Sequence, residues 1–198
     1  MHSIETRILE KIRTIPKGVL IFPENFHNFG SSEAIRIALH RLENDKIISR
    51  VAQGIYVRPK THKYIGKLTP TAENVANAIA KRDRIRTIPT GSYALNALGL
   101  STQIPMKIVL LTDGSPREIK VGKRTIKFKK TSPKNLLAKG EISSLVIQAL
   151  KSIGQNKLEN ESLKKLQTIL RKEIKENILH DAKLAPAWIN KILMSAVK

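Results

Sequence analysis

Apolar and polar residues alternate along the first sixty positions in a way that predicts a small domain of helices and short strands. Isoleucines at helical spacing predict a helix from Ile4 to Ile15, which begins after Ser3. The apolar run 19–22 predicts a buried strand, and the residues 24–29 predict a short helix that ends at Gly30. This domain therefore mixes α and β structure from its start.

A second amphipathic helix and a hairpin complete the pattern. Ser31 or Ser32 can cap a helix that turns Ile35, Leu39 and Leu42 inward. Its outer face carries polar residues, namely Glu33, Arg36, His40 and Glu43, with Arg41 at the margin. The segments 47–51 and 55–58 predict two strands around a tight turn at Gln53-Gly54, and Pro59 closes the module.

Helix, strand, short helix, capped helix and hairpin follow one another in the order typical of a winged helix-turn-helix domain. In such a domain the second helix of the turn lies in the major groove with its N-terminal residues towards the bases. The start of that helix can also bind a phosphate through backbone N–H groups. The residues that we expect to contact DNA here are Ser31, Ser32, Arg36, His40, Arg41, Arg50, Gln53 and Arg58.

Each of these residues also has a simpler structural explanation. The serines can serve as helix caps alone, and the arginines can be solvated surface charges. Arg36 has the clearest recognition chemistry, because its planar fork fits the O6 and N7 atoms of guanine. Arg50 and Arg58 flank the expected wing, where they are placed to meet phosphates. A winged helix can also be a pure protein-docking module.

Part of this region resembles a known family. The segments SEAIRIALHRL (32–42), DKIISR (45–50) and GIY (54–56) resemble the N-terminal domain of AbiEi-type antitoxins, which belong to bacterial abortive-infection, type IV toxin–antitoxin systems. At Gln53 the resemblance would lead us to expect a basic residue. The segment 87–105 is similar to the central segment of the same proteins, so the resemblance covers roughly residues 3–150.

The middle of the chain predicts an α/β domain. After a short linker at 64–67, a helix that starts near Pro70 turns Ala72, Val75, Ala76 and Ile79 inward. The segments 85–89 and 107–112 predict strands, the second of them central in a sheet, and 91–98 predicts a short helix. Gly122-Lys123 is a two-residue loop of type II′ that joins two strands into a hairpin.

That hairpin carries the sharpest basic patch of the sequence. Lys120, Lys127 and Lys129 share its outer face, opposite the apolar residues Ile126 and Phe128. We expect these lysines to contact nucleic acid, although lysines on an exposed strand also discourage aggregation between sheet edges.

The last third predicts a small helical bundle. Apolar residues at helical spacing predict helices over 140–153, 160–178 and 186–193, joined by short loops. The sequence thus predicts an α+β protein with two domains. A winged helix-turn-helix domain spans 1–62, and an α/β domain with C-terminal helices spans 67–198.

The amino-acid composition indicates what kind of partner the protein binds. The chain has 198 residues, with 36 Lys and Arg against 16 Asp and Glu, so its formal charge is +20. Residues 65–135 alone carry a net charge of +10. Such a charge favours a polyanionic partner. The sequence has no cysteine, no apolar run of 18 residues and no secretory signal, so we expect a cytoplasmic protein without disulfides or membrane attachment.

The chemistry of known enzymes finds little support in the sequence. Gly91-Ser92 followed by Asp113 is similar to part of the nucleotidyltransferase pattern, but the second aspartate that holds Mg²⁺ there is missing. Gly122-Lys123 lacks the spacing of a Walker motif, and Arg124 stands in the place of its Ser or Thr. We therefore expect no enzymatic activity, no cofactor and no metal.

The function that these observations favour is sequence-specific binding of double-stranded DNA as a transcriptional regulator. The resemblance implies an antitoxin that represses its own operon at promoter inverted repeats. It also implies an antitoxin that opposes a nucleotidyltransferase-like toxin without stable contact. The alternative is an RNA-binding or protein-interaction module that neutralises a toxin directly.

Overall fold

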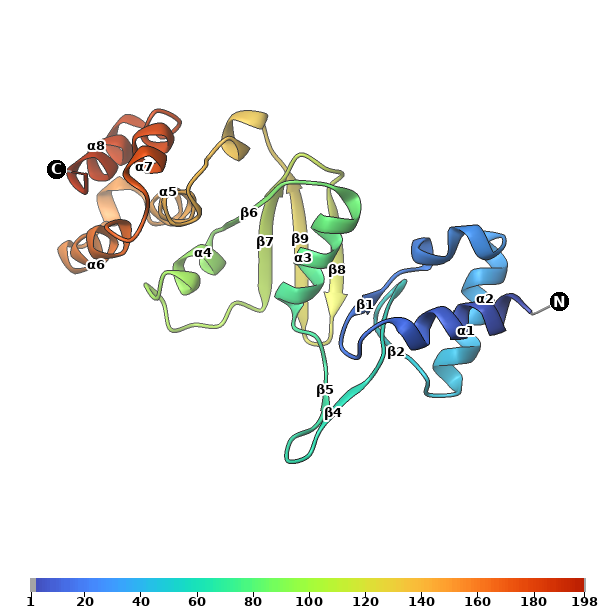
Figure 1. Cartoon of the computed structure of the whole chain (residues 1–198). Helices are drawn as coiled ribbons and strands as arrows, with labels where there is room; N and C mark the ends of the chain where they lie inside the picture. Colours follow the sequence, from blue (N-terminus) through green and yellow to red (C-terminus); the bar gives the residue numbers. More distant parts are fainter. Residues whose placement is uncertain (1–2, 198) are drawn as a thin grey trace. The chain divides into compact units, whose positions relative to one another are not determined.

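The computed structural model describes residues 3–197 and shows a mixed α+β protein (Figure 1). The chain forms two compact units. The first comprises Met1–Ala78 with Ile119–Lys123, and the second comprises Ile79–Glu118 with Arg124–Lys198.

The first unit begins with a helix, a short strand and a second helix. Helix α1 (Ile4–Thr14) is capped by Ser3, whose hydroxyl oxygen accepts the N–H of Thr6. Strand β1 (Leu20–Ile21) leads to a 3₁₀ helix, Pro23–Phe29, and then to α2 (Ser32–Asn44). These elements confirm the predicted order.

Two strands complete the sheet of this unit. Strands β2 (Ser49–Ala52) and β3 (Ile55–Val57) surround the predicted turn, where Gly54 has a φ of +67°. The sheet has the order β1-β3-β2 with antiparallel pairs. Its core holds the predicted inward residues together with others, namely Ile8, Ile12, Ile21, Phe26, Ile35, Leu39, Leu42, Ile48 and Tyr56.

A second hairpin follows where the sequence predicted a linker. Strands β4 (Lys60–His62) and β5 (Gly66–Leu68) pair with each other in a separate two-stranded sheet. The predicted linker 64–67 was wrong, because these residues form the turn and the start of β5. The hairpin is polar and exposed, so it lacks the apolar alternation by which a strand is found in a sequence.

Helix α3 (Ala72–Asp83) begins after Thr71, whose hydroxyl oxygen accepts the N–H of Asn74. Its predicted inward residues are all buried: Ala72, Val75, Ala76 and Ile79. Strand β6 (Thr87–Thr90), helix α4 (Ser92–Ala97) and strand β7 (Lys107–Thr112) follow it.

The larger sheet has the strand order β6-β7-β9-β8, with β8 at Arg117–Val121 and β9 at Arg124–Lys130. Strand β7 pairs antiparallel with β6 and parallel with β9, so it lies inside the sheet as predicted. Gly122 has a φ of +56°, the left-handed conformation that a type II′ turn requires at its first position.

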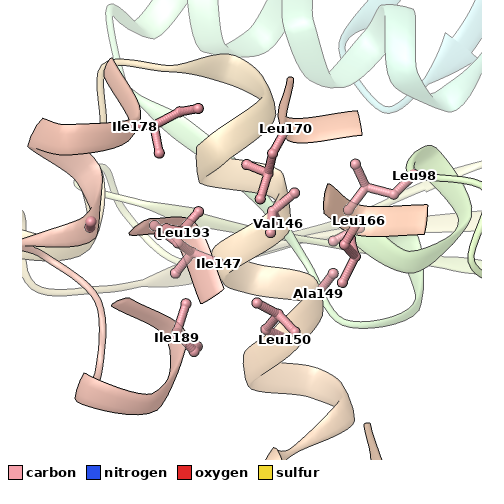
Figure 2. Close-up of a cluster of buried hydrophobic side chains, with 12 residues drawn as sticks. Leu98, Val146, Ile147, Ala149, Leu150, Leu166, Leu170, Ile178, Ile189 and Leu193 are labelled. Carbon is pink, nitrogen blue, oxygen red and sulfur yellow. The ribbon is translucent and has the colours of Figure 1, made fainter. Parts of the chain in front are cut away.

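Four helices at the C-terminal end pack around one apolar core. They are α5 (Glu141–Ile153), α6 (Asn160–Leu170), α7 (Lys175–Ala182) and α8 (Ala187–Ser195). Figure 2 shows Val146 of α5 near Leu170 of α6, Ile147 of α5 near Leu193 of α8, and Leu150 of α5 near Ile189 of α8. None of the helices within residues 3–197 is long and apolar enough to cross a bilayer.

The predicted single helix over 160–178 was wrong, since the chain breaks between α6 and α7. Glu173 lies in this break, and its carboxylate accepts the N–H groups of Ile142 and Ser143 at the start of α5. The apolar residues Leu170, Ile174 and Ile178 keep helical spacing across the break, so the sequence pattern conceals it.

Candidate nucleic-acid interface

The start of α2 is built by Ser31. Its hydroxyl oxygen accepts the N–H of Ala34 at 3.2 Å, and its carbonyl accepts the N–H of Ile35. Ser31 is therefore the N-cap, and Ser32 is the first helical residue, exposed at the first turn. The positive end of the helix dipole thus lies at an exposed surface.

One stripe of α2 faces away from the core. It contains Arg36, Ile37 and His40, all exposed. Within residues 3–197 the Arg36 guanidinium makes no hydrogen bond or ion pair. The Nε2 atom of His40 is 3.5 Å from the amide nitrogen of Asn44. Ile37 is 46% exposed, and it was not among the predicted DNA contacts because those were all polar residues.

Arg41 and Arg58, by contrast, have partners in α1. The Nη1 atom of Arg41 is 3.1 Å from a carboxylate oxygen of Glu5, and both side chains remain partly exposed. The Nη1 atom of Arg58 donates to the carbonyls of Arg13 at 2.7 Å and Ile15 at 2.6 Å, and more weakly to a third carbonyl at 3.3 Å. Arg58 therefore caps the C-terminal end of α1, so we do not count it among the proposed DNA contacts.

Arg50 is held beside the predicted wing. Its Nη2 donates to the Tyr56 hydroxyl at 3.2 Å, and its guanidinium lies 5.5 Å from the centre of the same ring. The Nε atom of Arg50 is 3.7 Å from a carboxylate oxygen of Glu43. The hydrogen bond to Tyr56 raises the pKa of Arg50 above its ordinary value. The side chain is half exposed, and Gln53 is exposed at the adjoining turn.

The three predicted lysines of β8 and β9 differ in their surroundings. Lys120 and Lys129 are exposed and have no partner among the described residues. Lys127 is less free, because its Nζ is 2.9 Å from a carboxylate oxygen of Glu118. Hydrogen bonds from Lys127 and then Lys107 hold the pKa of Glu118 below its usual range.

Asp113 is the acidic residue of the partial nucleotidyltransferase pattern, and it is hydrogen-bonded to Arg86. Its carboxylate accepts both the backbone N–H and the Nε–H of Arg86, each at 2.9 Å. The side-chain hydrogen bond from Arg86 is the main reason why the pKa of Asp113 is lowered. In the part of the chain that the structure describes, no three His, Asp or Glu side chains gather as a metal site.

A further basic feature is the segment that contains the hairpins β2–β3 and β4–β5. The segment 46–72 contains six Lys and Arg residues and no Asp or Glu. It includes the exposed hairpin β4–β5, whose tip carries Tyr64 at 82% and Ile65 at 70% exposure. Counting charges in windows shorter than a third of the chain would have found this segment from sequence.

The chain matches the model of one protein family over residues 7–178, and this family is described as a family of unknown function, DUF6088. Because that match covers most of the chain, the protein belongs to this family. The chain matches no curated protein.

Proposed function

We propose that this protein is a transcriptional regulator that binds double-stranded DNA sequence-specifically through a winged helix-turn-helix domain in its first unit. The observation that carries the proposal is the outward stripe of α2. It presents an unpaired guanidinium at Arg36, one turn after the helix start, next to Ile37 and His40. The element order and the strand order β1-β3-β2 also support this domain type.

The stripe has the chemistry that base recognition needs. A guanidinium can donate two parallel hydrogen bonds to guanine, and an exposed aliphatic side chain such as Ile37 can contact the methyl group of thymine. The start of α2 at Ser31 and Ser32 can bind a phosphate through its backbone N–H groups. His40 extends the same surface by one turn.

Around this stripe, other residues are placed for contacts to phosphates. Arg50 is oriented by Tyr56 and still half exposed, with Gln53 at the turn beside it. Arg41 would exchange its exposed ion pair with Glu5 for a phosphate at little cost, because such surface pairs contribute only about 0–1 kcal/mol. Elsewhere in the chain, the exposed residues Lys120 and Lys129 of the hairpin β8–β9 supply further positive charge.

The biological role that we propose follows from the resemblance to AbiEi-type antitoxins. In this role the protein represses its own operon at inverted repeats in the promoter. It opposes a nucleotidyltransferase-like toxin without stable contact between the two proteins. This role requires no cofactor and no metal.

The exposed tip of β4–β5 favours a second candidate function, in which the protein binds RNA or a toxin directly. Tyr64 and Ile65 are the most exposed large apolar side chains within residues 3–197. Surfaces of this kind commonly mark an interaction site. If direct binding neutralises a toxin, changing both residues to serine should abolish neutralisation and leave binding to promoter DNA unchanged.

DNase I footprinting of the DNA upstream of the protein's own gene tests the main proposal. The wild-type protein should protect a discrete segment that contains an inverted repeat, and Arg36→Ala should need a higher protein concentration for the same protection. Lys11→Ala is the matched control, because Lys11 is exposed on α1 and outside the proposed interface. Absence of any discrete protected segment with the wild-type protein would contradict the proposal.

A further inference from the structure

A cleft of about 310 Å³ opens in the first unit, away from the start of α2. It lies among the last turns of α1, the residues that follow α2 and the residues that follow β3. Its apolar lining comes from Leu9, Ile12, Ile47 and Pro59. A cleft of this size and lining suits a small organic molecule.

The charged lining of the cleft is entirely positive. It consists of Arg13, Lys17, Lys46 and Arg58, with no carboxylate among the lining residues. A fifth cation, Lys60, packs beside Gly18, the neighbour of Lys17 in the chain. Cations gathered around one cleft repel each other unless an anion lies between them.

Capping of the two helices that end here does not account for these charges. Arg58 already donates to the carbonyls at the C-terminal end of α1, and the Ile15 N–H also donates to the carbonyl of Ile12. Helix α2 is capped by backbone groups, since Lys46 N–H donates to Glu43 at 2.9 Å and Ile47 N–H donates to Leu42 at 3.0 Å. Within residues 3–197, Arg13, Lys17 and Lys46 make no hydrogen bond or ion pair through their side chains.

We propose that this cleft binds a small organic anion, in which a phosphate or carboxylate group contacts Arg13, Lys17 and Lys46 and an apolar body covers Leu9 and Ile47. Arg58 forms a fixed wall, because its hydrogen bonds to α1 restrict its position. Helix α2 has 13 residues and is therefore about 20 Å long, with Ser31 at one end and the cleft at the other. The anion site is thus separate from the proposed DNA-contacting stripe, and it does not depend on the proposed function.

Fluorescence titration of the full-length protein with 1-anilinonaphthalene-8-sulfonate tests this site, because the dye combines an anionic group with an aromatic body. We expect saturable binding at one site in the absence of DNA. The double variant Arg13→Gln/Lys46→Gln should bind the dye about tenfold more weakly or worse, since it loses two charge-assisted contacts. Phenyl phosphate or benzoate should displace the dye, and the better competitor identifies the anionic group.

Two control variants distinguish binding in the cleft from non-specific attraction of the dye to the protein surface. Lys11→Gln/Lys175→Gln removes the same charge from exposed positions outside the cleft, and Tyr64→Ser removes the exposed aromatic ring. Both should bind the dye like the wild type, and thermal unfolding checks that all variants fold. The proposal would be overturned if the first control lost as much dye affinity as Arg13→Gln/Lys46→Gln, or if Tyr64→Ser lost dye affinity. Unchanged dye binding in Arg13→Gln/Lys46→Gln would also overturn it. So would displacement by inorganic phosphate at the same concentration as phenyl phosphate.

Discussion

Arg36 and Arg58 carry the same charge, yet their surroundings differ. Arg36 is exposed and unpaired within the described residues, whereas Arg58 donates to backbone carbonyls of α1. The sequence placed both in one set of expected DNA contacts, because a side chain's partners are not visible when they lie 43 to 46 residues away. The same holds for Arg41, whose partner Glu5 is 36 residues away.

Arg36→Ala should weaken binding to the protein's own promoter DNA by about 1–3 kcal/mol and relax the base preference at one position. The reason is the loss of a two-pronged contact to a base edge. Competition experiments with single-base variants of the promoter site measure this effect. An equal loss on promoter and random DNA would show that Arg36 contacts phosphate only.

Arg58→Ala should lower the free energy of unfolding by about 1–3 kcal/mol, because the change leaves carbonyls at the end of α1 without their donor. Arg58→Lys should recover part of this loss, since a positive charge remains near the helix C-terminus. Urea denaturation measures both variants. Arg36→Ala serves as the control and should leave stability within about 0.5 kcal/mol of the wild type.

At the scale of elements, turn chemistry and periodicity predicted most of the fold. The strands around Gly122-Lys123 and the inward face of α3 were found from local residues alone. The break between α6 and α7 was not, because the Glu173 carboxylate in this break accepts hydrogen bonds from the backbone N–H groups of a helix distant in sequence. The hairpin β4–β5 was missed because it buries almost nothing.

The start of α5 shows how distant residues support an element. Asp181 of α7 is fully buried, and its carboxylate accepts the N–H groups of Lys139 and Gly140 and the hydroxyl of Ser143. Gly140 leaves room for this arrangement, since a Cβ atom there would clash with the Ser143 hydroxyl and lie 2.5 Å from a carboxylate oxygen of Glu173. Burial acts to raise the pKa of Asp181, but hydrogen bonds from His180, Ser143 and the backbone outweigh it and lower the pKa.

This lowered pKa predicts how stability depends on pH. The unfolded chain binds a proton at Asp181 at a higher pH than the folded protein does, so the contribution of this carboxylate is present at neutral pH. It is lost as the pH falls from the ordinary aspartate value of about 4 through the lower pKa of the folded state. Asp181→Asn should therefore reduce the slope of unfolding free energy against pH in this acid range. An unchanged slope would contradict the assignment.

At the scale of the whole molecule, the proposed function assigns general attraction to DNA to the net charge of +20 and base selectivity to the stripe on α2. The sequence predicted the polyanionic partner from charge alone. The sequence could not show which lysines lack an acidic partner. The structure shows that Lys127 forms an ion pair with Glu118.

The double variant Lys120→Gln/Lys129→Gln tests the general attraction. Each phosphate that a lysine neutralises adds about 0.9 to the slope of log affinity against log salt, so this slope should flatten by up to about 1.8. Affinity should fall on promoter and random DNA alike. Lys127→Gln should have a smaller effect, since Glu118 already compensates its charge. An unchanged slope in the double variant would mean that these lysines do not face DNA.

The central claim is that the protein distinguishes one DNA sequence from others. The most direct measurement is the ratio of dissociation constants for the DNA upstream of its own gene and for a shuffled duplex of equal length and composition. Fluorescence anisotropy at one fixed salt concentration near physiological strength gives both constants. The proposed function predicts binding to the upstream DNA about 10³-fold tighter or more, as expected for a specific regulator. Equal constants for the two duplexes would contradict it.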